Sequence, residues 1–150
     1  MSITVRPAST ADIAGIAAFN QAMATETEGK ALATDKIMAG VTRMLNDPSL
    51  GFYLVAEADG GLVGCLGITF EWSDWRNGLF WWIQSVFVDP DYRRRGVFAN
   101  LYNYVSELAR QEQDVCGIRL YVEHDNSNAQ RTYLGLGMVE TAYKLLEVEF

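Results

Sequence analysis

The sequence predicts a mixed α/β protein with a mostly antiparallel central sheet flanked by helices. Apolar runs with the alternation of strands are interleaved with segments whose apolar residues recur at helical spacing. A tight turn, Asp59-Gly60-Gly61, joins two of these strands as a hairpin, so the sheet is not purely parallel. The length of 150 residues suits one domain, 1–150, with no linker or repeat inside it.

The elements follow in an order that fixes part of the topology. Ser9 or Thr10 can cap the first helix and Thr34 the second, which Asn46-Asp47-Pro48 ends. The expected helices are 10–25, 34–46, 96–112 and 126–136. The expected strands are 3–6, 52–58, 62–70, 79–88, 118–123, 138–141 and 143–149, with a polar aromatic loop at 71–78. Because a helix separates strands 79–88 and 118–123, those two should be parallel neighbours.

Composition excludes several classes of protein. The formal net charge is -7 and the sequence pI is about 4.6, whereas a nucleic-acid binder usually carries a basic face. There is one histidine, His124, and no spacing typical of metal ligands, so we expect no metal. No apolar stretch is long enough to cross a bilayer, and no signal peptide is visible at the N-terminus, so we expect a cytoplasmic protein without a membrane partner.

The segment 86–98 carries the main functional signal. An apolar strand, Val86-Phe87-Val88, runs through Asp89-Pro90 into Arg93-Arg94-Arg95-Gly96, and Gly96 opens a helix. Free N–H groups and the positive dipole end of a helix attract anions, a glycine allows close approach of the backbone, and arginines complement phosphates. The pattern therefore favours pyrophosphate binding, although a basic turn that merely caps a helix fits these residues equally well. It matches neither the nucleoside-triphosphate loop nor the dinucleotide-binding glycine pattern.

Two segments resemble sequence motifs of the GNAT superfamily of acetyl-CoA-dependent N-acetyltransferases. In the first, Arg93, Gly96 and Phe98 occupy the positions of Gln or Arg, Gly, and Gly or Ala, with Phe98 replacing the small residue. The second motif is matched by Asn126, Ala129, Tyr133, Gly137 and Met138 in order and spacing. The order of the expected elements agrees with that family over the whole chain.

The resemblance implies acetyl-CoA as acyl donor and a splayed pair of strands that holds it. The backbone of Val86, Phe87 and Val88 would pair with the pantetheine arm. The loop Arg93 to Phe98, which includes Arg94, Arg95, Gly96 and Val97, would bind the pyrophosphate. Asn126 and Ala129 would border the pantetheine on the other side. Tyr133, also next to the cofactor, stands where the family places the general acid that protonates the departing thiolate, and its alternative is a tyrosine that packs on the sheet.

A general base is harder to identify. Many relatives have a glutamate on the strand that here contains Gln84 and Ser85, which can only position a water. Glu28, Glu71 and Asp74 are candidates for the base, and each also fits a solvated loop carboxylate. A water relay, or an amine that arrives deprotonated, is equally consistent.

The acceptor pocket is expected between 25–30 and 71–78. Its predicted residues are Glu71, Trp72, Trp75 and Trp82, which could hold a cationic amine by charge and stacking. Because neighbouring strand residues face opposite sides, one of Trp81 and Trp82 should be core and the other pocket.

The resulting hypothesis is transfer of an acetyl group to a primary amine of a small molecule or peptide by direct attack. The alternative is a catalytically inactive module that binds acyl-CoA and regulates. A homodimer paired through the last strands, as in many relatives, fits either hypothesis.

Overall fold

The computed structural model describes all 150 residues, which form two compact units, Met1–Leu120 and Tyr121–Phe150. The first unit contains the whole sheet, with strands β1 (Thr4–Pro7), β2 (Gly51–Ala58), β3 (Gly61–Ser73), β4 (Gly78–Val88) and β5 (Val115–Leu120). Its helices are α1 (Ile13–Glu28), α2 (Thr34–Asn46) and α3 (Val97–Gln111), with short 3-10 turns at Thr10–Asp12 and Pro90–Tyr92. None of the helices is both long and apolar enough to cross a bilayer.

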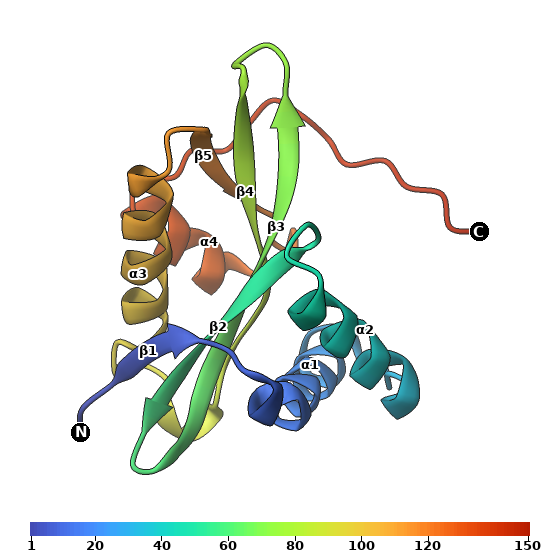
Figure 1. The fold of residues 1–150 in the computed structure, drawn as a ribbon, viewed down its shortest axis with the longest axis vertical. Helices are drawn as coiled ribbons and strands as arrows, with labels where there is room; N and C mark the ends of the chain where they lie inside the picture. Colours follow the sequence, from blue (N-terminus) through green and yellow to red (C-terminus); the bar gives the residue numbers. More distant parts are fainter. The chain divides into compact units, whose positions relative to one another are not determined.

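The five strands lie in sequence order across one sheet, β1-β2-β3-β4-β5 (Figure 1). The first four pair antiparallel, and β4 and β5 pair parallel through the α3 crossover. The predicted mixed, mostly antiparallel sheet and the parallel pair of 79–88 with the strand after the helix are therefore confirmed. The hairpin turn is confirmed as well: Asp59 and Gly60 both have positive φ, the conformation that a two-residue hairpin turn requires.

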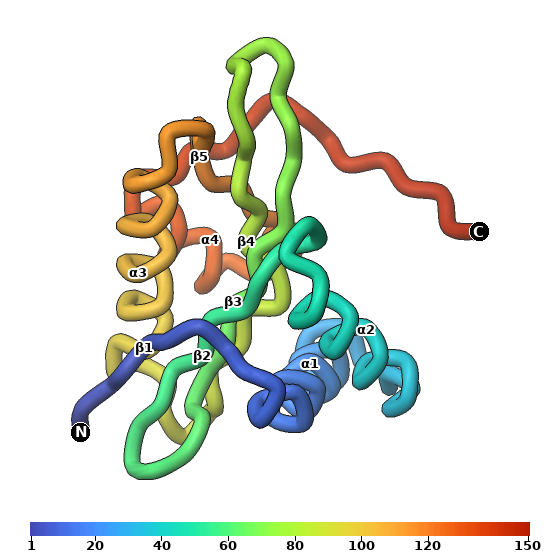
Figure 2. The backbone as a smooth tube through the Cα atoms, in the orientation of Figure 1, coloured from blue at the N-terminus to red at the C-terminus, as the bar shows by residue number.

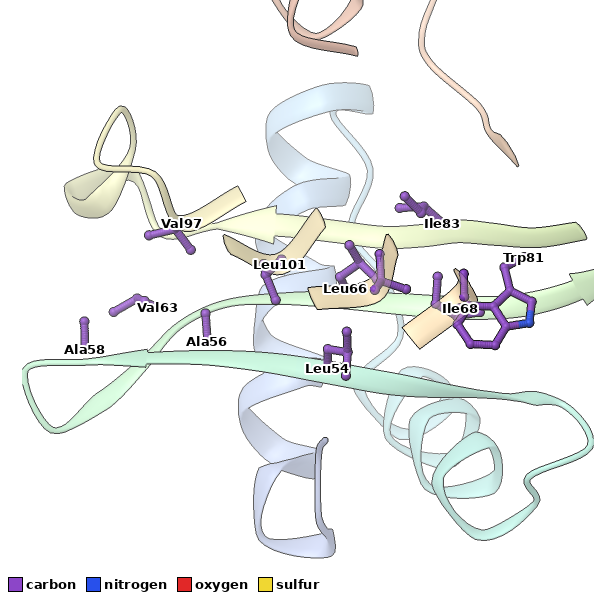
Figure 3. Packing of buried hydrophobic residues seen from close by; sticks show 12 residues of the cluster. Leu54, Ala56, Ala58, Val63, Leu66, Ile68, Trp81, Ile83, Val97 and Leu101 are labelled. Atoms are coloured by element: carbon purple, nitrogen blue, oxygen red, sulfur yellow. The ribbon is translucent and has the colours of Figure 1, made fainter. Parts of the chain in front are cut away.

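Helices cover both faces of the sheet. Helices α1 and α2 lie together on one face and α3 lies on the other, as the tube in Figure 2 makes clear. On the α3 side, Val97 and Leu101 pack against Leu54, Leu66 and other buried residues (Figure 3). On the opposite side, Ile16 and Val41 pack against Val55, Cys65 and Phe87. Along β2, the residues of the two sets alternate, as the apolar periodicity of this segment predicts.

A capping box begins the first helical segment. The Ser9 backbone N–H donates to Asp12 Oδ2 at 2.8 Å, and the Asp12 carboxylate also accepts two hydrogen bonds from Arg6. At the other end of α1, Gly29 is left-handed (φ 62°), and its N–H donates to the Thr25 carbonyl. The α1 helix therefore ends sharply, and residues 29–33 form the corner that leads to α2.

The β3–β4 hairpin is longer than the sequence suggested. Residues 71–78 were expected to be a loop, but strand pairing continues through Trp72↔Leu79 and Ser73↔Gly78, so only 74–77 turn the chain. Aromatic residues are good strand formers, and the cross-strand pairs of this segment extend the ladder past the polar positions. The strand predicted at 118–123 is also shifted, because β5 begins at Val115 and ends at Leu120.

The second unit contains one helix, α4 (Ser127–Gly135), and no strand. The predicted strands 138–141 and 143–149 are wrong. These residues form an extended chain with exposed apolar side chains, of which Leu146 is 90% accessible. A strand needs a neighbouring strand to pair its backbone N–H and C=O groups, and alternation of apolar residues does not supply one.

Candidate active site

The candidate site begins where β4 loses its parallel neighbour. Pairing of β4 with β5 ends at Ile83↔Leu120, whereas pairing of β4 with β3 continues to Gly64↔Val88. The β3–β4 register shifts between Cys65 and Gly67, so β4 contains a bulge, and Ser85 within it has a left-handed φ of 54°. The end of β4 thus has a partner on one edge only.

The backbone of Val88 faces that open edge. The Asp89 N–H donates to the Val63 carbonyl at 2.8 Å, and the alternation of an antiparallel ladder turns the N–H and C=O of Val88 away from β3. Of these two groups, the Val88 carbonyl accepts a hydrogen bond from Arg93 Nε at 3.0 Å.

The loop after β4 places backbone donors at the start of α3. Asp89 accepts the Asp91 N–H, and left-handed residues at Arg94 (φ 63°) and Gly96 (φ 83°) then turn the chain into the helix. The first intrahelical bond is from the Asn100 N–H to the Gly96 carbonyl, so the N–H groups of the first turn, 97–99, have no acceptor in the helix. A side chain at Gly96 would meet no backbone, so the left-handed φ is what requires glycine there.

These donors fit an anionic group such as a pyrophosphate. The start of a helix, a left-handed entry and nearby cations are features typical of anion sites. Phe98, which replaces a small residue of the family pattern, lies 6.1 Å from the Tyr102 ring between centroids and packs against the α3-side core. The aromatic ring that replaces the small residue is therefore part of the packing on the α3 side.

The three arginines of this loop have different surroundings. The Arg93 guanidinium forms a two-point ion pair with the Glu26 carboxylate, at 2.8 and 2.9 Å. Arg95 lies over the Tyr92 ring, 5.5 Å from its centroid. Arg94 is exposed and makes no hydrogen bond or ion pair through its side chain. The sequence could not reveal the Arg93–Glu26 pair, because the two residues are 67 positions apart.

On the sheet face opposite α3, polar and aromatic side chains of β3, β4 and β5 bind one another. Gln84 Nε2 donates to Thr69 Oγ1 at 2.9 Å, and Trp82 Nε1 donates to Glu71 Oε1 at 3.1 Å. The same Glu71 oxygen accepts from Arg119 at 2.6 Å, and the Arg119 guanidinium lies 3.6 Å from the centroid of the Phe80 ring. The same Glu71 oxygen is therefore already engaged by Arg119 and Trp82, which does not suit a free base. Arg119 was missed by sequence reasoning.

The structure separates the predicted acceptor residues. Trp82 lies on the same face as Glu71, whereas Trp72 follows Phe70 by two and shares its side, the α3 side. Trp75 is at the hairpin tip and is 86% accessible. Trp81 is buried in the α3-side core, so the prediction that one residue of the Trp81-Trp82 pair is core is confirmed. Glu28 is exposed as the last residue of α1.

Three predicted residues belong to the second unit. Asn126 Oδ1 accepts the Ala129 N–H at 3.2 Å, so Asn126 caps α4. Tyr133 lies in α4, and burial raises the pKa of its phenol above the ordinary value. A tyrosine phenol is neutral at pH 7 in any case, and burial favours that form further.

The sequence and the fold are similar to those of known acetyltransferases. The profile of the Acetyltransferase (GNAT) family matches residues 16–138. This chain belongs to the GNAT family of acetyltransferases. A structure described as a possible acetyltransferase from Clostridium difficile 630 is 44% identical, with a TM-score of 0.91 and coverage of 100% of this chain and 99% of that one. The enzyme is thus an acetyltransferase, and acetyl-CoA is the acyl donor of its family.

More distant structures share the fold of this GNAT acetyltransferase. A predicted acetyltransferase with acetyl-CoA from Clostridium acetobutylicum is 17% identical, with a TM-score of 0.80 over 99% of this chain and 96% of that one. AAC(6')-Iy, in complex with a bisubstrate analog, CoA-S-monomethyl-acetylneamine, is 16% identical, with a TM-score of 0.81 over 100% and 99%. A search of curated proteins finds no match.

Proposed function

We propose that this GNAT acetyltransferase moves an acetyl group from acetyl-CoA to a primary amine of a small molecule or peptide by direct attack. The observation that carries the proposal is the end of β4, which pairs with β3 alone and leads into the left-handed turn at Arg94 and Gly96 that opens α3. Acetyl-CoA supplies an activated thioester, and this chain supplies an open strand edge and an anion-binding turn.

Each proposed role follows from the surroundings of the residue. Val86, Phe87 and Val88 offer the backbone edge, and the turn from Arg93 to Phe98 offers the anion site. Tyr133 is the proposed general acid, because a phenol carries its proton at neutral pH and the raised pKa of this partly buried one favours the neutral form further. Asn126 and Ala129, at the start of the same helix, are proposed to border the pantetheine arm.

On the proposed acceptor side, the Glu71 carboxylate is paired with Arg119, so fewer acidic groups are candidates for the base than the sequence suggests. The Gln84 amide nitrogen donates a hydrogen bond to Thr69, and we propose that the amide oxygen positions a water. Glu28, exposed at the end of α1, is the proposed base. Glu71 is neutralised by Arg119, so we propose that Glu71 and Trp82 orient the acceptor and do not remove its proton. Trp72 and Trp75, apart from Trp82 in the structure, are proposed only as outer walls.

The alternative function is a module that binds acyl-CoA without catalysis. It is favoured by one observation: β4 has no carboxylate, and Glu71 on the neighbouring strand β3 is bound to Arg119. Tyr133 argues against it, because binding alone does not need a phenol at that position.

A thiol-release assay with acetyl-CoA tests both. The amines should be polyamines, aminoglycosides, amino acids and N-terminal peptides, with acetyl-CoA binding followed by calorimetry. We expect Tyr133→Phe to lose turnover about 10²- to 10⁴-fold and to keep acetyl-CoA binding. Tyr104→Phe, on α3 away from the turn, is the matched control and should keep both. Binding with no turnover on any amine would favour the regulatory module.

We also propose that the enzyme forms a homodimer through residues 138–150. This segment has no strand partner, and large apolar side chains along it are exposed, including Val139, Tyr143, Leu146 and Val148. Exposed alternating apolar residues with unpaired backbone groups favour pairing with another strand.

A further inference from the structure

Arg93 stands at the first position of the predicted pyrophosphate turn, yet its side chain is bound to other parts of the protein. Its two terminal nitrogens bind the two oxygens of Glu26, at 2.8 and 2.9 Å. Its Nε donates to the Val88 carbonyl at 3.0 Å. The guanidinium also lies over the Phe87 ring, 5.5 Å from the centroid. The contacts with Glu26, the Val88 carbonyl and the Phe87 ring together fix the position of the guanidinium.

The partner side of this arrangement is one face of α1. Phe19 and Glu26 are two helical turns apart, so they share a face. Phe19 packs on Phe87 with ring centroids 5.3 Å apart, and Glu26 binds the arginine that lies over the same ring. Phe87 is therefore contacted by α1 and by Arg93, and the end of α1 is tied to the end of β4.

This tie has a consequence for the corner after α1. Glu26 lies in the last turn of α1, and the Gly29 and Lys30 N–H groups close that turn on the Thr25 and Ala24 carbonyls. The corner 25–30, which includes Glu28, is thus connected through one rigid turn to Glu26. A shift of the β4 end would move the corner with it.

We propose that Arg93 and Glu26 are positioning residues that hold the acceptor-side corner 25–30 against the end of β4, and that Arg94 and Arg95 supply the charge for the pyrophosphate. This assignment rests on the proposed function for the identity of the two ligands. The tie itself does not depend on it.

Two measurements test the proposal, and neither requires the amine to be known. The first is amide hydrogen exchange over residues 24–30 in Glu26→Gln, Arg93→Gln and the double variant. We expect about two- to fivefold faster exchange in each single variant, no further increase in the double variant, and little difference at 1 M salt, because an exposed ion pair is screened. The charge-swapped pair, Glu26→Arg with Arg93→Glu, should restore slow exchange. Glu107→Gln on α3 is the matched control.

The second measurement is calorimetry with acetyl-CoA. We expect Glu26→Gln and Arg93→Gln to change the affinity by less than about threefold, whereas Arg94→Gln combined with Arg95→Gln weakens it by about tenfold or more. Unchanged exchange at 24–30 in the single variants would overturn the proposal. A loss of affinity above about tenfold in Arg93→Gln, with normal affinity in Glu26→Gln, would also overturn it and would make Arg93 a direct phosphate ligand. If the wild type bound no acetyl-CoA, the proposed function would fail, and the exchange result would still decide the tie.

Discussion

Asp12 shows at the residue scale how a buried charge can contribute to stability. Its side chain is almost fully buried, and hydrogen bonds from Arg6, more than those from Ser9, hold the pKa of the carboxyl below its usual value. A carboxylate whose pKa is lowered on folding stabilises the protein above its unfolded pKa, and that contribution is lost as the pH falls through the folded pKa.

We therefore expect Asp12→Asn to lower the free energy of unfolding by about 1–3 kcal/mol at pH 7. The gap from wild type should close as the pH falls below the ordinary range of an aspartate, because the wild-type carboxyl then also becomes neutral. Urea unfolding at pH 7 and near pH 3 measures this. Asp35→Asn, in the exposed first turn of α2, should change stability by less than about 0.5 kcal/mol. A gap that stayed constant with pH would show that Asp12 acts by packing alone.

Ser85 is a second residue whose effect is local. Its left-handed φ of 54° costs free energy for any residue with a Cβ. Ser85→Gly should stabilise the protein by a few tenths of a kcal/mol, up to about 1 kcal/mol, whereas Ser85→Ala keeps the strain and should give no gain. Thermal and urea unfolding of both variants compare them directly. Equal stability of the glycine and alanine variants would mean that the bulge is not strained.

At the scale of elements, the sequence predicts most of the first unit. Helix α2 and helix α3 each have an amphipathic pattern, and the Asp59-Gly60 turn fixes the β2–β3 hairpin. These features are local, so neighbouring residues are enough to reveal them. The β4 bulge is not visible, because nothing about Ser85 as a residue type demands φ > 0.

Long-range partners explain the remaining differences. Glu71 reads as a loop carboxylate until β5 brings Arg119 to its oxygen, and Arg93 reads as a phosphate ligand until α1 brings Glu26 beside it. The segment 138–150 has strand periodicity and forms no strand, because periodicity shows which side chains share a face and does not supply a neighbouring edge. Within the candidate site, the sequence therefore reveals the local backbone features, such as the glycine that opens α3, and not the side-chain partners.

At the scale of the whole molecule, we expect the proposed dimer to depend on residues 138–150. Sedimentation velocity over a range of concentrations should show a dimer of the 150-residue chain and a smaller species when Tyr143, Leu146 and Val148 are replaced by serine together. Glu140→Gln with Glu147→Gln, in the same segment, is the control that leaves the apolar side chains in place. A dimer that survived the serine variant would place the interface elsewhere.

The charge of the whole molecule gives the binding of acetyl-CoA a distinctive dependence on salt. The chain carries a formal net charge of -7, so we expect long-range repulsion of the anionic donor and local attraction by the exposed Arg94 and Arg95 of the proposed pyrophosphate turn. A ligand present at 100 times its Kd stabilises a protein by about 2.7 kcal/mol, which for a chain of this length corresponds to about 5–10 °C in Tm. We expect that shift in a thermal unfolding scan with acetyl-CoA.

The Arg94→Gln, Arg95→Gln double variant should show a smaller shift at the same ligand concentration, while its own Tm without ligand changes little, because both side chains are exposed. Since acetyl-CoA would be attracted locally by these two charges, raising the salt to 0.5 M should reduce the wild-type shift more than that of the double variant. A full shift in the double variant would mean that backbone donors alone bind the pyrophosphate, and no shift in the wild type would contradict the assignment of the turn.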